Sequence, residues 1–170
     1  LNPEIAITPS GRTPSVLSGE ITINHLTYCY PNSTQKVLDD LNLHIKPGQT
    51  VAIMGRVGAG KTTFLKLLVR LLDDKSQSVI IDGCNIQDYP LAQIRAQIAL
   101  VPQDPFLFGE PLKDNLTYDD PNRALEAIWN AATSADLQHT IEQFPDQLDT
   151  LVGERGVTLS GGQKQRATLA

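Results

Sequence analysis

A glycine-rich loop over residues 55–62 has the composition of a phosphate-binding site. It reads GRVGAGKT, which fits the pattern G-x-x-x-x-G-K-[ST]. Glycines let the backbone turn sharply, so that successive N–H groups point at phosphate oxygens, and a following helix adds the donors of its N-terminus. In this geometry Lys61 reaches the β- and γ-phosphates, Thr62 ligates Mg²⁺ and Thr63 adds an α-phosphate contact. The loop residues expected to bind are Gly55, Gly58, Ala59, Gly60, Lys61, Thr62 and Thr63.

A second glycine pair lies farther down the chain, in the segment LSGGQ at residues 159–163. Ser160 is suited to cap a helix that begins here, and Gly161 and Gly162 leave the first-turn amides open to a phosphate. The alternative is a helix that is capped and binds nothing. The segment is therefore a candidate for a second phosphate contact.

The first loop needs a strand before it and a helix after it, and the sequence predicts both. Residues 50–54 form the short apolar run of a fully buried strand. Residues 61–72 carry apolar side chains at the spacing of a buried helix. This context favours phosphate binding over the alternative, a flexible glycine turn with an exposed lysine.

Strands and helices alternate along the rest of the first hundred residues. The further strands expected are residues 21–26, 37–45, 79–81 and 98–101, and a short helix is expected at residues 91–97. This alternation predicts an α/β sheet with parallel members. After Pro121, residues 123–135 and 137–144 have the pattern of two helices, which predicts a helical subdomain inserted into the α/β body.

Composition limits the classes of protein that the chain can belong to. The 170 residues suffice for one sizeable core, and no apolar run approaches the roughly 20 residues of a membrane-spanning helix. Fourteen Lys plus Arg against 19 Asp plus Glu give a net charge of −5 without a basic cluster, so we expect no nucleic-acid partner. Residues 1–18 mix Pro, Ser, Thr and Gly without periodicity and are expected to be a linker.

Together, the two loops resemble those of the nucleotide-binding domain of ABC transporters, whose signature motif is L-S-G-G-Q. The resemblance extends from about Gly19 to Ala170. It implies an α/β fold, namely a P-loop NTPase core with a mixed sheet, N-terminal antiparallel β strands and an inserted helical subdomain at about residues 112–165. It also implies that residues 19–170 are a partial ABC ATPase domain that binds ATP and Mg²⁺.

The resemblance assigns roles to residues outside the first loop. Tyr30 falls where the family places an aromatic residue that stacks on adenine; Tyr28 is the other candidate, and packing into the sheet is the alternative role. Gln103 matches the Q-loop glutamine, which touches Mg²⁺ and the attacking water and faces the transmembrane coupling helices. Lys61 and Gln103 are thus the expected catalytic residues, and Thr62 and Gln103 the expected metal contacts.

In the family, two such domains sandwich two ATP molecules head to tail. The expected ATP contacts from the signature motif are Ser160, Gly161, Gly162 and Gln163. The segment around Glu154 looks like the x-loop of exporters, which contacts the intracellular loops of the membrane domain. The expected partners are therefore a second nucleotide-binding domain and a transmembrane domain of the same or another chain. Residues 1–18 are expected to be the linker that follows such a transmembrane domain, which is absent from this segment.

Some parts of the family pattern are not matched. The Walker B aspartate, the glutamate after it and the switch histidine would follow Ala170, so the resemblance implies that the C-terminal part of the fold is missing. Residues 79–82 look like an apolar strand ending in Asp82, but a turn glycine follows, and we reject them as a substitute. Ser78 stands where Gly is usual and Val57 where a small hydroxyl residue is usual. We expect the segment alone to bind ATP weakly and to turn it over negligibly.

These features predict the ATP-binding subunit of an ABC exporter, an ATPase at the cytoplasmic face of the cell membrane through an attached transmembrane domain. The nearest resemblance is to multidrug or lipid half-exporters. A type I protein-secretion ATPase, a soluble ABC-type ATPase without a membrane partner and a regulatory module that does not hydrolyse ATP remain alternatives. The transported substrate is not readable from this segment.

Overall fold

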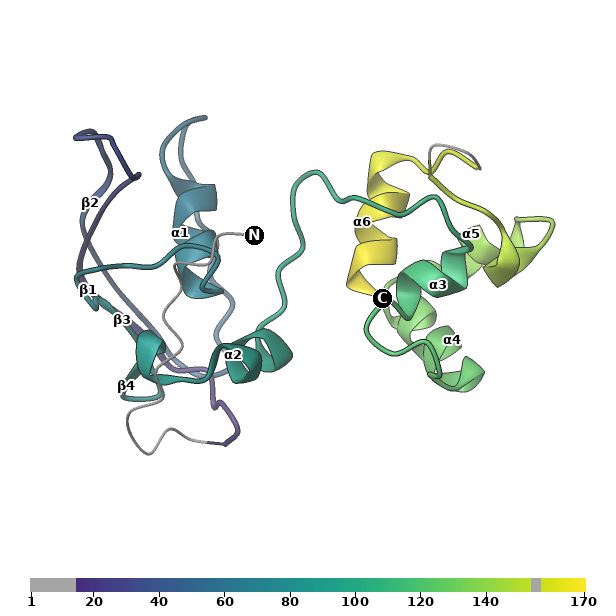
Figure 1. Ribbon diagram of the computed structural model, residues 1–170, viewed down its shortest axis with the longest axis horizontal. Helices are drawn as coiled ribbons and strands as arrows, with labels where there is room; N and C mark the ends of the chain where they lie inside the picture. The colour runs from purple at the N-terminus through teal and green to yellow at the C-terminus, as the bar shows by residue number, and fades with distance from the viewer. Residues whose placement is uncertain (1–14, 154–156) are drawn as a thin grey trace. The chain divides into compact units, whose positions relative to one another are not determined.

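The computed structural model describes residues 15–153 and 157–170 (Figure 1). The chain divides after Leu100 into two compact units. Among the described residues, no helix combines the length and the apolar character that crossing a lipid bilayer requires. The expected x-loop residue Glu154 lies outside the described residues.

The first unit is built on a four-stranded antiparallel sheet. Its strands are β1 (Ile21–Cys29), β2 (Lys36–Ile45), β3 (Val79–Ile81) and β4 (Cys84–Asn85), in the order β2-β1-β3-β4. The register pairs Ile21 of β1 with both Ile45 and Ile81. Ile23 and Leu26 of β1 are three residues apart and yet both are buried in the same core. The pairing of β1 with β2 shifts register between them, where His25 has a left-handed φ of 53°, and this irregularity turns both side chains to one face. The antiparallel N-terminal strands predicted from the sequence are confirmed.

Helix α1 (Lys61–Leu68) follows the glycine loop and packs on this sheet. It stops four residues before the predicted end, because Arg70 adopts a left-handed φ of 50°. The Leu71 amide then donates to the Lys66 carbonyl at 2.9 Å and the Arg70 amide to the Leu67 carbonyl at 3.2 Å. These two bonds satisfy carbonyls that the helix end leaves unpaired.

The first unit ends with a 3-10 helix, η1 (Ile86–Asp88), and the predicted α2 (Leu91–Gln97). Its core is formed by strand and helix residues that are almost fully buried. The largest of them are Ile23, Leu26, Leu67, Val79, Ile81, Tyr89 and Ile94.

Two predicted buried strands do not form. Residues 50–54 and 98–101 have no strand hydrogen bonds to any described residue. Met54 is 90% exposed, and Val51 and Val101 are also exposed. An apolar run becomes a parallel strand only when neighbouring strands accept its backbone hydrogen bonds and cover both faces. The described residues provide no such neighbour, and the sheet that they form has no parallel pair.

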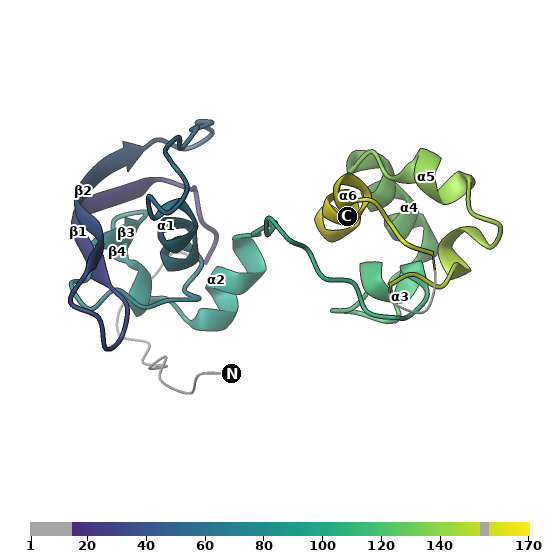
Figure 2. The same cartoon turned by 90° about the horizontal axis from the view of Figure 1, so that it is seen from above.

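The second unit is helical, as the sequence predicted. Its elements are α3 (Leu112–Leu116), α4 (Leu125–Ser134), α5 (Gln138–Glu142), the 3-10 helix η2 (Gln147–Asp149) and α6 (Gly161–Leu169). Figure 2 shows α3, α4, α5 and α6 gathered around one another. Their common core contains the buried residues Leu112, Ile128, Ala132, Leu137, Ile141, Leu148, Val152, Leu159 and Ala167.

Candidate functional site

The glycine loop of the first unit bends through two left-handed residues, Gly58 with φ 84° and Gly60 with φ 85°. Only glycine adopts this conformation at little cost. The turn places Gly60 as the N-cap of α1, and the helix then begins at Lys61. The first turn of α1 carries no acidic side chain, so its N-terminal amides and the positive end of its dipole are available to an anion.

Gly60 also needs to be glycine because β2 lies against it. A Cβ at this position would lie 2.7 Å from the Val37 carbonyl oxygen and 2.8 Å from Leu38 Cδ2. These separations are too short for real contacts, so a side chain would push the loop away from the strand. The sheet therefore sets the position of the loop through a contact that tolerates no side chain.

The Lys61 side chain lies over the loop that precedes it. Its Nζ donates to the Gly55 carbonyl at 2.6 Å and to the Arg56 carbonyl at 2.8 Å. The Ala59 amide donates to the Arg56 carbonyl at 3.2 Å, which closes a turn inside the loop. The ammonium group is thus held at the mouth of the loop, where a bound phosphate would meet it.

Tyr30 and the glycine loop lie close together, although the sequence separates them by a whole strand. The Tyr30 hydroxyl is 2.9 Å from Thr63 Oγ1, in the first turn of α1. The Tyr30 ring is 40% exposed and meets the ring of Tyr28 edge to face, with centroids 5.4 Å apart. Tyr28 itself is buried, and burial followed by its neighbours Tyr30 and Asp73 raises the pKa of its hydroxyl. Tyr30 is therefore the ring of the two with a face open to a base.

The signature segment of the second unit forms a capping box at the start of α6. Ser160 Oγ accepts from the main-chain N–H of Gln163 at 3.3 Å, and the side-chain Oε1 of Gln163 accepts from the main-chain N–H of Ser160 at 2.8 Å. Gly161 and Gly162 are exposed. Capping by Ser160 is confirmed, and the Gln163 side chain, expected to contact ATP, is here used by the cap.

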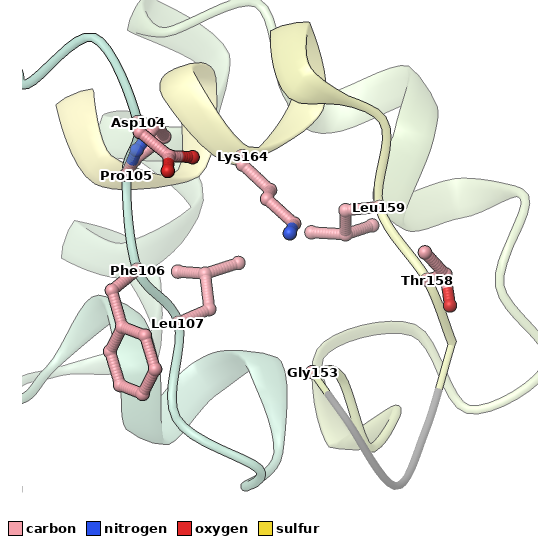
Figure 3. Close-up of a pocket in the computed structure, with 8 residues that line it drawn as sticks. All are labelled: Asp104, Pro105, Phe106, Leu107, Gly153, Thr158, Leu159 and Lys164. Atoms are coloured by element: carbon pink, nitrogen blue, oxygen red, sulfur yellow. The ribbon is translucent and has the colours of Figure 1, made fainter.

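Gln103 lies beside the signature helix within the second unit. The Gln165 side-chain amide donates to the Gln103 carbonyl at 3.4 Å, and the Gln103 side chain is exposed. A pocket of about 380 Å³ lies beside it, lined on one side by residues 104–107 and on the other by Gly153, Thr158, Leu159 and Lys164. Figure 3 shows the Lys164 side chain with its ammonium group pointing into the space that the labelled residues line.

An aromatic group stands on the surface next to this pocket. Phe108 stacks on Tyr118 with centroids 5.1 Å apart and meets Phe106 edge to face at 5.2 Å. Phe106 and Tyr118 are both 73% exposed. We call Phe106, Phe108 and Tyr118 the aromatic group. Exposed large rings gathered in this way mark surfaces that bind a partner.

Sequence reasoning missed Asn115, the residue that shapes this surface. Its Oδ1 accepts from the Phe108 amide at 2.7 Å, and its Nδ2 lies within 3.2–3.3 Å of the carbonyls of Phe108, Glu110 and Pro111. The one sequence signal is an Asn placed inside a short helix, because Asn side chains favour bonds to nearby backbone.

The residues present fit a nucleotide with its metal ion. Thr62 is an exposed hydroxyl at the first turn of α1, an oxygen ligand of the kind that Mg²⁺ prefers. No group of three or more His, Cys, Asp or Glu side chains among the described residues forms a metal site of its own. A metal at this loop would therefore depend on phosphate oxygens as well as on Thr62.

Comparisons with known proteins match these features. The family model described as ABC transporter matches residues 38–170. The chain is 42% identical over 168 residues to the ABC transporter ATP-binding protein YwjA of Bacillus subtilis (strain 168), which covers 99% of this chain and 29% of that protein. It is 41% identical over 155 residues to a putative multidrug export ATP-binding/permease protein of Staphylococcus aureus (strain NCTC 8325), covering 91% of this chain and 27% of that protein.

The chain is also similar to a solved structure. The structure of a bacterial Atm1-family ABC exporter with ATP bound superposes with a TM-score of 0.87 at 33% identity, over 98% of this chain and 29% of that chain. The chain therefore spans less than a third of the length of these relatives.

Proposed function

Because this chain belongs to the ABC transporter family, we propose that it is the ATP-binding segment of an exporter that couples ATP binding and hydrolysis to transport across a membrane. The observation that carries the proposal is the glycine loop, with Gly58 and Gly60 in left-handed conformations and Lys61 held over its mouth. The relatives named as multidrug export proteins and the Atm1-family exporter favour export over the soluble ATPase alternative.

The triphosphate would lie in the loop, with the base against Tyr30. Backbone amides of residues 58–63 and the Lys61 ammonium would neutralise the phosphate charge, and Mg²⁺ would be held by Thr62 together with phosphate oxygens. The metal ion supplies charge neutralisation at the transferred phosphoryl group. Gln103 is proposed to contact the metal ion and the attacking water in the assembled protein.

The signature segment would bind the nucleotide held by a second domain. Its two exposed glycines and the capped start of α6 are a second anion-binding end of a helix, separate from the first loop. Head-to-tail pairing of two domains would give both anion sites a role, with residues 58–63 of one domain facing residues 160–163 of the other. ATP would then hold the pair closed and hydrolysis would release it.

The pocket beside Lys164 and the aromatic group would face the membrane domain. The pocket is lined by both apolar and charged residues, and exposed rings stand next to it. An intracellular loop of a transmembrane domain is the proposed partner of this surface, and the segment would then lie at the cytoplasmic face of the membrane.

Nucleotide binding by the full-length protein tests the proposal. Lys61→Met removes the ammonium group and keeps the side-chain length, and Lys66→Met makes the same change at an exposed position of the same helix. We expect Lys61→Met to weaken ATP–Mg²⁺ binding at least about tenfold, as loss of a charged hydrogen bond requires, and to abolish turnover. Lys66→Met should bind and turn over ATP like the wild type. Equal affinity in the two variants would contradict the proposal.

Pairing of the domains is tested separately. In the full-length protein, Gly161→Asp places a negative charge at the start of α6, where the nucleotide of the other domain would lie. We expect it to leave ATP binding to a single domain intact and to prevent the closed pair, which the rate of forming a cysteine bond between the two domains would detect. A closed pair that forms normally would argue against the head-to-tail arrangement.

A further inference from the structure

The chain entering the first unit is fastened by the side chain of Gln97, the last residue of α2. Gln97 Oε1 accepts from the Leu17 amide at 2.7 Å, and its Nε2 donates to the Ser15 carbonyl at 3.0 Å. One side-chain amide thus accepts from and donates to the same stretch of backbone, as a neighbouring strand would. Residues expected from composition to be part of a linker are therefore held against the unit.

A second side chain, Asp82, fastens the next residues of the same segment. Its Oδ1 accepts from Ser18 Oγ at 2.5 Å and from the Glu20 amide at 2.9 Å, and its Oδ2 accepts from the Ser18 amide at 2.7 Å. The Asp82 amide in turn donates to the Glu20 carbonyl at 2.9 Å. The carboxylate thus binds residues 18–20 through both of its oxygens.

Both fastening residues lie in hydrogen-bonded elements of the unit. Asp82 and Gly83, with φ of 49° and 77°, form the two-residue turn between β3 and β4, a turn that this residue pair favours. Helix α2 is anchored by Ile94, which is fully buried. Leu17 adds a third contact, because it packs against the core of the unit. A displacement of residues 15–20 therefore acts on the sheet edge and on α2 together.

We propose that residues 15–20 are a strap that carries displacement of the preceding part of the protein into α2, and that Asp82 and Gln97 are the positioning residues that fasten it. The inference rests on the proposed function, in which a transmembrane domain is the partner of this segment, and it takes that domain to precede residues 15–20 in the chain. Gln97 is six residues ahead of Gln103 in the sequence, so the strap acts at the start of the segment that carries the Q-loop glutamine.

Asp82 and Gln97 bind mainly the main chain of the strap and not its side chains. Apart from Ser18 Oγ, every group that Asp82 and Gln97 bind is a main-chain amide or carbonyl. The fastening residues are thus the ones to change, because substitutions within the strap would leave most of these bonds in place. Changing Asp82 or Gln97 therefore removes these bonds and leaves the packing of Leu17 in place, so that the two contributions can be told apart.

The test uses the full-length protein in lipid nanodiscs. Asp82→Asn keeps a residue that favours the left-handed turn but removes the charge and one acceptor. Gln97→Met keeps the length of the side chain and loses both hydrogen bonds, and Gln97→Glu, which loses only the donor to Ser15, is a milder second variant. Arg95→Met, at an exposed position of the same helix, is the matched control.

Hydrogen–deuterium exchange is measured in the nucleotide-free state and with ATP, Mg²⁺ and vanadate, together with the dissociation constant for ATP. We expect Asp82→Asn and Gln97→Met to speed exchange at Leu17 and Ser18 about tenfold. In peptides ahead of Ser15, the difference in exchange between the nucleotide-free and the vanadate-trapped state should fall by about half or more. The dissociation constant for ATP should stay within about twofold of the wild-type value. Arg95→Met should match the wild type in every measurement.

Three outcomes would overturn the strap. Unchanged exchange at Leu17 and Ser18 would show that Asp82 and Gln97 do not hold the segment. Faster exchange there with a wild-type nucleotide-dependent difference ahead of Ser15 would show that the strap transmits nothing. A wild-type protein that binds ATP without any such difference would also refute it. A wild-type protein that fails to bind ATP would instead overturn the proposed function, and with it the role of the strap.

Discussion

The hydroxyl of Tyr30 lies 2.9 Å from the hydroxyl of Thr63, so the ring proposed to stack on adenine is joined to the first turn of the helix that follows the phosphate loop. The edge contact with Tyr28 restrains the same ring from another side. The first turn of α1 therefore holds both the ring proposed to contact the base and the groups proposed to contact the phosphates, and the ring is oriented before a nucleotide binds. Such preorganisation lowers the entropic cost of binding.

Removing the Tyr30 hydroxyl should weaken ATP binding less than removing its ring. Tyr30→Phe keeps the stacking surface and loses one hydrogen bond, for which we expect a cost of about 0.5–1.5 kcal/mol in binding free energy. Tyr30→Ala also loses the stacking contact and should cost a further 1–3 kcal/mol or so. Isothermal titration of ATP into the full-length protein measures both. Thr63→Val combined with Tyr30→Phe should cost no more than Thr63→Val alone, because the Tyr30 hydroxyl has no partner once the Thr63 hydroxyl is removed.

Gly60→Ala should destabilise the protein more than Gly58→Ala. Both glycines have positive φ, which costs an L-residue about 1–2 kcal/mol. A Cβ at Gly60 additionally overlaps the Val37 carbonyl, whereas one at Gly58 meets no described atom within 4 Å. Thermal unfolding of the two variants measures the difference. Equal losses would show that the contact between the loop and β2 carries no energy.

The stabilising effect of Asp82 should disappear in acid. Burial alone would raise the pKa of this carboxyl, but the hydrogen bonds from Ser18, Glu20 and the Gly19 amide outweigh it and hold the pKa below its usual value of 3.8. A depressed pKa in the folded state stabilises the protein above the unfolded pKa, and this contribution is lost as pH falls through the folded value. Asp82→Asn should therefore lower the unfolding temperature at pH 7. Its deficit relative to the wild type should shrink once the pH falls well below 3.8. A deficit that is independent of pH would contradict this account.

The 170-residue segment expressed by itself should unfold with poor cooperativity and turn over ATP negligibly. Residues 50–54 carry exposed Val51, Ile53 and Met54, and no described strand pairs with them. Unpaired apolar segments of this kind raise the energy of the folded state and promote association. Calorimetry of the segment beside the full-length protein tests this, and a sharp transition with ATPase activity in the segment alone would refute it.

Features set by a few neighbouring residues were predicted from the sequence. The loop at residues 55–60, the start of α1 at Lys61 and the capping of α6 by Ser160 follow from local backbone chemistry, because each needs only residues within one or two turns. Strands β1 and β2 were predicted from alternating apolar and polar residues, which is also a local pattern, but the register shift between Ile23 and Leu26 was not.

Features that join distant parts of the chain appeared only in the folded molecule. Tyr30 meets Thr63, Asp82 and Gln97 hold residues 15–20, and β2 leaves no room for a side chain at Gly60. Residues 50–54 and 98–101 have the composition of buried strands and yet form none. A residue's type records which bonds and what burial it favours, but the partner that satisfies them is chosen by the packing of the whole chain. Because these contacts join residues that are 22 (Gly60 and Leu38) to 82 (Gln97 and Ser15) positions apart, no local pattern encodes them.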